Sequence, residues 1–184
     1  LEQDLVLCEK AGFDYIEIRL DMLTDYLKRH TVEELAAFFC TSRLKPHAFN
    51  ALYLYPEFLS EGDDEAREKE LLEEFRLGCE VGRAIGSHYF IIVPPLQRDP
   101  AGGPYTGSWE DTFSNCVRIL KELSRRAEPY DMNLCFELVG FERSSVRSIG
   151  QADAVVRAVD RPNVGFVFDS YNIFLNGGCN DFSA

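Results

Sequence analysis

The chain has no surplus of positive charge and no long apolar run. Its 19 Lys and Arg stand against 31 Asp and Glu, which gives a formal net charge of −12 over 184 residues. Because phosphate contacts need clustered Lys and Arg, we expect no nucleic-acid partner. The sequence also has no run of 18 apolar residues, so it predicts no membrane-spanning helix. Its first residues show no charged segment followed by an apolar one, and no signal peptide is predicted.

Cysteine pairs are also missing. The six cysteines are far apart, and no Cys-x-x-Cys motif joins them: Cys8, Cys40, Cys79, Cys116, Cys135 and Cys179. Most fall at apolar positions of expected helices or strands. We therefore interpret them as reduced core cysteines of a cytoplasmic protein, rather than as disulfides or zinc ligands.

What the sequence does contain is a regular alternation of strand-like and helix-like segments. The composition, 46% hydrophobic and 27% charged, is that of a globular protein. Strands are expected within residues 14–20, 46–55, 88–94, 133–140 and 164–172. Helices are expected to end near Gly12, to open at Thr31 with Glu34, to run from about 63 to 86, to begin near Trp109, and to open at Ser148 with Gln151. This repeated order predicts an α/β fold with a parallel sheet.

Two architectures fit that order, an open doubly wound sheet and a (β/α)₈ barrel. No Gly-rich phosphate loop follows the first visible strand, which disfavours the dinucleotide-binding form of the open sheet. A barrel usually needs about 250 residues, whereas this chain starts on a helix and stops just after a strand. We predict a single domain, residues 1–184, forming an incomplete (β/α)₈ TIM barrel that lacks its first strand and its last two βα units.

Two carboxylates stand near the ends of predicted buried strands. Glu137 lies in Asn-Leu-Cys-Phe-Glu-Leu-Val-Gly, and Asp169 lies in Val-Gly-Phe-Val-Phe-Asp-Ser-Tyr-Asn. A buried carboxylate is costly unless a metal, a cation or hydrogen bonds compensate it. Because the two are one βα unit apart, they predict a shared polar site at the carboxyl end of the sheet.

The segments LEQDLVLCEKAGFDYIEIR, KPHAFNAL, CFELVG and RPNVGFVFDSYN together resemble the xylose-isomerase-like TIM-barrel family of sugar isomerases and epimerases, and within it the inosose isomerases of inositol catabolism. The resemblance implies a divalent metal held by a Glu, an Asp, a His and a second Glu at the ends of barrel strands five to eight. Glu137 and Asp169 match the first two ligands. The His and the second Glu would fall beyond Ala184. A ligand set of oxygens with one His favours Mn²⁺, with Zn²⁺ or Co²⁺ also compatible.

The chemistry implied by the resemblance is the interconversion of a ketone and a neighbouring secondary alcohol through an enediolate. Glu137 is then both a metal ligand and one acid/base, and Asp169 is a ligand only. The substrate is a small sugar or cyclitol, and a homodimer is compatible with the family. Many relatives have Asp-x-x-His at the sixth strand, where the His reaches substrate hydroxyls. Here that position is Asn172, which can hydrogen-bond to substrate but cannot act as an acid or base near pH 7.

Three further residues are candidate substrate contacts. Glu17 and Arg19 lie two apart on one strand, and they either form an internal ion pair or contact the substrate. Asn50 lies on the next strand, where it lines the pocket or serves a turn. Asp21 is expected on a surface loop, and His47 at the amino end of a strand, where a structural role is favoured.

Other functions remain open at this point. An inosose dehydratase would share the barrel and the proton abstraction, and a chain that is natively this short would be an inactive binding module. A metal-dependent apurinic endonuclease is disfavoured, because it needs several metal-binding His and a basic surface, whereas this chain has three His and a net charge of −12.

Overall fold

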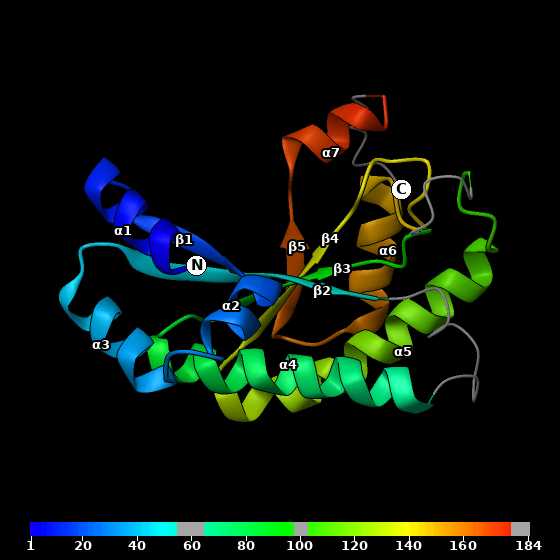
Figure 1. Cartoon of the computed structure of the whole chain (residues 1–184). Coiled ribbons are helices and arrows are strands. Elements are labelled where there is room, and N and C mark those ends of the chain that lie inside the picture. The colour runs from blue at the N-terminus through cyan, green and yellow to red at the C-terminus, as the bar shows by residue number, and fades with distance from the viewer. Residues whose placement is uncertain (55–64, 98–102, 178–184) are drawn as a thin grey trace.

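The computed structural model describes residues 1–54, 65–97 and 103–177. Its centre is a parallel sheet of five strands in sequential order (Figure 1). The strands are β1 (Tyr15–Arg19), β2 (Lys45–Tyr53), β3 (Tyr89–Val93), β4 (Asn133–Glu137) and β5 (Val164–Val167). Among the described residues the sheet does not close, and β1 and β5 are its edges. The predicted parallel α/β sheet of an incomplete barrel is therefore confirmed.

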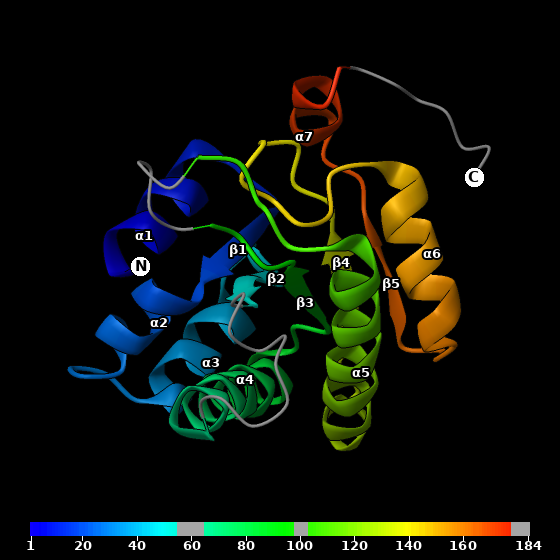
Figure 2. The same cartoon turned by 90° about the vertical axis from the view of Figure 1, so that its right-hand side faces the viewer.

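Helices precede, connect and follow the strands. They are α1 (Glu2–Ala11), α2 (Leu20–Tyr26), α3 (Val32–Thr41), α4 (Glu65–Ile85), α5 (Trp109–Ala127), the short 3₁₀ helix η3 (Glu128–Tyr130), α6 (Ile149–Val159) and α7 (Ser170–Leu175). Figure 2 shows α3 to α6 following one another around one side of the sheet. That side is called the outer face here, and the opposite side the inner face. No helix among the described residues is long and apolar enough to cross a membrane.

Local sequence signals determine where several helices begin and end. Both expected capping boxes are present: Thr31 with Glu34 opens α3, and Ser148 with Gln151 opens α6. Gly12 ends α1 with φ +84°, a left-handed conformation that favours glycine. The expected helix from about 63 is confirmed from Glu65 onward, and residues 63 and 64 lie outside the described part.

The two faces of the sheet are packed differently. Large side chains of the outer face, such as Phe49, Phe90 and Phe136, are fully buried against the helices. The inner face carries a smaller apolar cluster: Ala48, Ala51, Ile91, Val93 and Val139. Because side chains alternate between faces along a strand, the polar residues Glu17 and Glu137 share this inner face.

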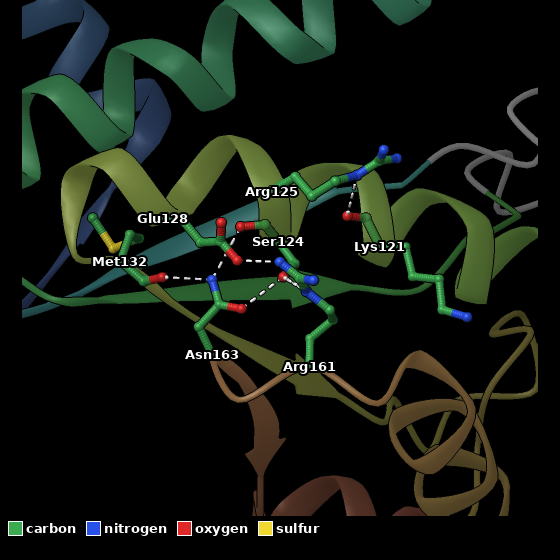
Figure 3. A network of polar contacts seen from close by, with 7 residues as sticks. All are labelled: Lys121, Ser124, Arg125, Glu128, Met132, Arg161 and Asn163. Atoms are coloured by element: carbon green, nitrogen blue, oxygen red, sulfur yellow. Dashed lines mark hydrogen bonds and ion pairs between the residues drawn. The ribbon is translucent and has the colours of Figure 1, made fainter.

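A polar network joins α5 to the connection between α6 and β5 (Figure 3). Asn163 accepts a hydrogen bond from the Ser124 hydroxyl at 2.6 Å and donates to the carbonyl oxygens of Ser124 (3.0 Å) and Met132 (3.3 Å). Arg161 donates to the Ser124 hydroxyl at 3.1 Å and pairs with Glu128. These bonds hold the amino end of β5 beside β4.

The structure corrects three local expectations. Helices α2 and α7 were not predicted, and Asp21, expected on a loop, lies in the first turn of α2. Trp109, the first residue of α5, is 37% exposed. Of the cysteines, Cys79 and Cys116 are buried, whereas Cys40 is exposed; Cys179 lies outside the described residues.

Candidate functional site

The predicted polar site lies where the strands end at their carboxyl side. Glu137 is the last residue of β4 and pairs in register with Val167 of β5. Asp169 follows β5 by two residues and caps α7. Parallel pairing therefore brings the two strand ends together, as expected for a site at this end of the sheet.

Glu137 is a partly buried carboxylate whose pKa is raised from 4.5 to about 7. Burial is the largest cause, followed by the negative charges of Asp169 and Glu17, while a hydrogen bond from Asn172 opposes the rise. Each of the three raising effects disfavours the ionised carboxylate. A cation placed here would reverse that balance.

Asp169 is held by the helix that follows it. Its Oδ1 accepts the backbone N–H of Tyr171 at 2.8 Å, which is the usual bond of an N-cap aspartate. The Oδ2 atom accepts a hydrogen bond from Asn172 at 3.0 Å. The first turn of α7 thus fixes the direction of this carboxylate.

Asn172 connects the two carboxylates. Its Nδ2 donates to Glu137 Oε1 at 3.2 Å as well as to Asp169 Oδ2, and its Oδ1 accepts the backbone N–H of Gly140 at 3.3 Å. The residue is 7% exposed. The structure therefore places the predicted substrate contact Asn172 between the two predicted metal ligands.

Glu17 and Asn50 form a second polar pair on neighbouring strands. Asn50 Nδ2 donates to Glu17 Oε2 at 2.9 Å, and Asn50 stands opposite Arg19 in the register of β1 and β2. Glu17 is close enough to Glu137 to raise its pKa. The pair therefore lies on the same inner face as Glu137.

One of the two expectations was an ion pair between Arg19 and Glu17, and the structure does not contain it. Arg19 makes a two-point ion pair with Asp21, from Nε to Oδ1 at 3.0 Å and from Nη2 to Oδ2 at 2.6 Å. The nearby turn into α2 brings Asp21 within reach. Both side chains are exposed, and Glu17 instead accepts its hydrogen bond from Asn50.

A cavity of about 800 Å³ opens beside these residues. Its walls come from β1, α2, β2, α4 and the loops after β3 and β4: Arg19, Leu20, Asp21, Asn50, Ala51, Tyr53, Glu74, Leu96, Gln97, Phe141 and Arg143. Arg19 and Asn50 were singled out from the sequence. The loop residues Gln97, Phe141 and Arg143 were not, because no local signal places residues 97 and 143 together.

Those two loops are joined by backbone hydrogen bonds. Gln97 N–H donates to the carbonyl of Arg143 at 2.8 Å, and Ser145 N–H donates to that of Pro95 at 3.0 Å. The β3 and β4 loops are therefore one structural unit along the rim of the cavity.

Gly140 is a further residue that sequence reasoning missed. A Cβ atom at this position would lie 2.0 Å from the backbone oxygen of Asn172, so only glycine allows this approach. Its place at the end of the Glu-Leu-Val-Gly segment was the available signal. Gly140 lets the β4 loop pack directly on α7.

The donor set at this site fits a divalent cation in part. Glu137 and Asp169 offer carboxylate oxygens, and their mutual repulsion together with burial leaves Glu137 poorly compensated. Among the described residues, no group of three or more His, Cys, Asp and Glu side chains is arranged to hold a metal. The described residues therefore offer two neighbouring carboxylates, Glu137 and Asp169, and no complete metal site.

The three histidines lie elsewhere. His47, near the start of β2, makes ring contacts with Tyr15 and Tyr89. His30 stacks on Tyr26, and His88 lies beside Asp131. In the described part of the chain, none of the three histidines contacts Glu137. The ring contacts of His47 are those of a structural residue, which is the role favoured for it.

Comparison with known proteins identifies the relatives of this chain. Residues 5–184 match the model of the xylose isomerase-like TIM barrel family. The chain is 39% identical to an inosose isomerase of Bacillus velezensis and 37% identical to that of Bacillus subtilis, over 96% of its own length. It spans about 60% of the length of these relatives.

Solved structures agree. The IOLI protein, whose crystal structure contains a bound zinc atom, superposes with a TM-score of 0.82 at 37% identity, covering 96% of this chain and 60% of that one. A D-allulose 3-epimerase from Methylomonas sp., 22% identical over 94% of this chain and 57% of that one, shares the fold with a TM-score of 0.72. The chain belongs to the xylose isomerase-like TIM barrel family.

Proposed function

We propose that the full-length protein is a metal-dependent isomerase or epimerase of a keto-cyclitol or ketose, with inosose as the first substrate to test. The names of its relatives support an isomerase acting on a small polyhydroxylated ketone. The free thiols of the described cysteines are the basis for placing this enzyme in the cytoplasm.

The observation that carries the proposal is the position of Glu137. It ends a barrel strand on the inner face, beside a second carboxylate, with a pKa raised to about 7. A general base must lie within reach of the proton that it removes, and a carboxylate at a strand end on the inner face is placed at the catalytic end of a barrel. Glu137 is therefore suited to take a proton from the carbon next to the substrate carbonyl.

Each residue of the site has a distinct part in this proposal. Glu137 accepts the carbon-bound proton, and the electron pair left behind moves toward the carbonyl oxygen. A second acid outside the described residues returns a proton, to the same carbon in an epimerisation. In an isomerisation it protonates the former carbonyl carbon, and the proton of the original hydroxyl passes to the former carbonyl oxygen. When bound to Glu137 and Asp169, a divalent cation supplies Lewis-acid stabilisation of the negative charge on the substrate oxygens.

The Glu17–Asn50 pair and Arg19 are the proposed contacts for substrate hydroxyls. Glu17 Oε1 has no hydrogen-bond partner among the described residues, and Asn50 lines the cavity. Acceptor oxygens of this kind bind hydroxyl donors. Arg19 is paired with Asp21, and both residues line the cavity wall.

The identity of the metal is part of the same proposal. Zinc in the IOLI structure supports a divalent ion, but it gives no support to the preference for Mn²⁺ drawn from ligand chemistry alone. Zn²⁺, Mn²⁺ and Co²⁺ should therefore be compared directly.

The test is turnover by the full-length protein loaded with each metal. We expect interconversion of keto-inositols, with exchange of the substrate α-proton in D₂O, and loss of both in Glu137→Gln. Absence of exchange across a panel of keto-cyclitols and ketohexoses would overturn the proposal. A product lighter by one water molecule would instead identify a dehydratase.

A further inference from the structure

Asn172 uses every hydrogen-bonding atom of its amide within the protein. The two Nδ2 hydrogens are directed to Glu137 Oε1 (3.2 Å) and Asp169 Oδ2 (3.0 Å), and Oδ1 accepts the Gly140 N–H (3.3 Å). Only one amide orientation satisfies these partners, because carboxylates accept and an N–H donates. With 7% of its surface exposed, the side chain has little left to offer a substrate.

The Gly140 contact holds this amide in place. The absence of a Cβ lets the β4 loop approach the backbone of α7 closely, and the buried Gly140 N–H then meets Asn172 Oδ1. The amide is thus anchored from β4 at one end and donates to both carboxylates at the other.

We infer that Asn172 is a positioning residue of the metal site, which orients Glu137 and Asp169 toward a shared cation and does not contact the substrate. This inference rests on the proposed metal site. It differs from the role implied by family resemblance, in which the residue at this position reaches substrate hydroxyls.

The geometry explains how one amide serves both carboxylates. Its donors reduce the repulsion between two negative groups that approach each other at the ends of β4 and β5. Glu137 Oε2 has no hydrogen-bond partner among the described residues, so the atom remains free for a cation or a proton. Partners of metal-ligating side chains of this kind fix ligand orientation.

The two roles for Asn172 predict different measurements. A substrate contact, when lost, raises KM and leaves the affinity for metal unchanged. A positioning residue, when lost, weakens metal binding in the absence of any substrate and alters the geometry of the bound ion.

The experiment is metal titration of the full-length protein by calorimetry, together with the visible spectrum of the Co²⁺ form, which reports coordination geometry. Asn172→Leu removes the donors while keeping a similar shape, and Asn172→Ala serves if leucine does not fold. Asn50→Leu is the matched control, because it removes an amide donor to Glu17 on the same inner face without touching Glu137 or Asp169.

We expect Asn172→Leu to weaken metal binding by about 10- to 100-fold and to change the Co²⁺ spectrum at saturating metal, whereas Asn50→Leu leaves both as in wild type. Gly140→Ala, which displaces Asn172 without altering its chemistry, should weaken metal binding in the same way. The double variant Gly140→Ala/Asn172→Leu should bind metal only slightly more weakly than whichever single variant binds it more weakly. Both substitutions act through the same contact, so their effects on metal affinity should not add.

Two results separate failure of this inference from failure of the proposed function. If Glu137→Gln loses metal while Asn172→Leu and Asn172→Ala keep wild-type affinity and spectrum, the positioning role is wrong and the metal site stands. If the wild-type protein binds no divalent metal, the proposed function fails and the inference fails with it.

Discussion

The two ends of the inner sheet face differ in kind. At the amino end, the rings of Tyr15, His47 and Tyr89 contact one another, with centroids 5.7 and 5.5 Å apart. At the carboxyl end, Glu137 and Asp169 meet across Asn172. The first arrangement is favourable in itself, whereas the second holds like charges together.

The two ends of the strands therefore differ in whether their contacts stabilise the fold. The amino end of a barrel is generally its structural end, and the carboxyl end carries the catalytic groups. Here the network of Ser124, Arg161 and Asn163 holds the amino ends of β4 and β5 together (Figure 3). The neighbouring carboxylates lie at the other end of the same two strands.

The largest effect is expected from Glu137→Gln. Removing this charge should weaken divalent metal binding by about 100-fold and abolish turnover, because one ligand and the base are lost together. Asp131→Asn is the matched control at the amino end, where an exposed carboxylate lies beside His88. Its metal affinity, measured by the same titration, should equal that of the wild type; an equal loss in both variants would contradict the comparison.

A smaller effect is expected at the Glu17–Asn50 pair. Asn50→Ala should raise KM for the keto-cyclitol about tenfold, the equivalent of ~1.4 kcal/mol, because one polar contact to a substrate hydroxyl is lost. Steady-state kinetics and metal titration on the same preparation check this. A fall in metal affinity without a change in KM would contradict the proposed contact between Asn50 and a substrate hydroxyl.

The pKa of Glu137 predicts how stability varies with pH in the metal-free protein. Because the folded-state pKa is about 7 and the ordinary value is 4.5, the folded state binds the proton more tightly. The contribution of Glu137 to the free energy of unfolding is therefore fully present below pH 4.5, and it is lost as the pH rises to about 7. Urea unfolding of wild type and Glu137→Gln across this range should show the slope in wild type alone.

The smallest effect belongs to the aromatic row. His47→Ala removes two ring contacts and should lower the free energy of unfolding by about 1 kcal/mol, with metal affinity unchanged. Parallel urea unfolding and metal titration measure both quantities. A loss of metal binding here would mean that the two ends are not separate in function.

Local signals predicted most of the fold. The capping boxes of Thr31 and Ser148 depend on residues three apart, so the sequence reveals them directly. Short helices are different. Helix α7 has six residues, and Asp169, recognised as a strand-end carboxylate, is also the N-cap that starts it.

The sequence indicated which residues belong to the candidate site, but it did not indicate which of them contact one another. The carboxylates Glu137 and Asp169 were identified by their place at strand ends and by family resemblance. The contact between Asn50 and Glu17 joins residues 33 apart and depends on the register of β1 and β2, which includes an irregularity between Ile16 and Ile18. The approach of Gly140 to Asn172 likewise depends on how a loop packs on a helix.

The central claim is that the carboxyl end of the inner face binds a divalent cation through Glu137 and Asp169. Equilibrium dialysis of the full-length protein against Zn²⁺, Mn²⁺ and Co²⁺, with metal content measured for wild type, Glu137→Gln and Asp169→Asn, tests it most directly. The account predicts one tightly bound ion in wild type and its loss in both variants. Wild-type metal content in either variant would contradict it.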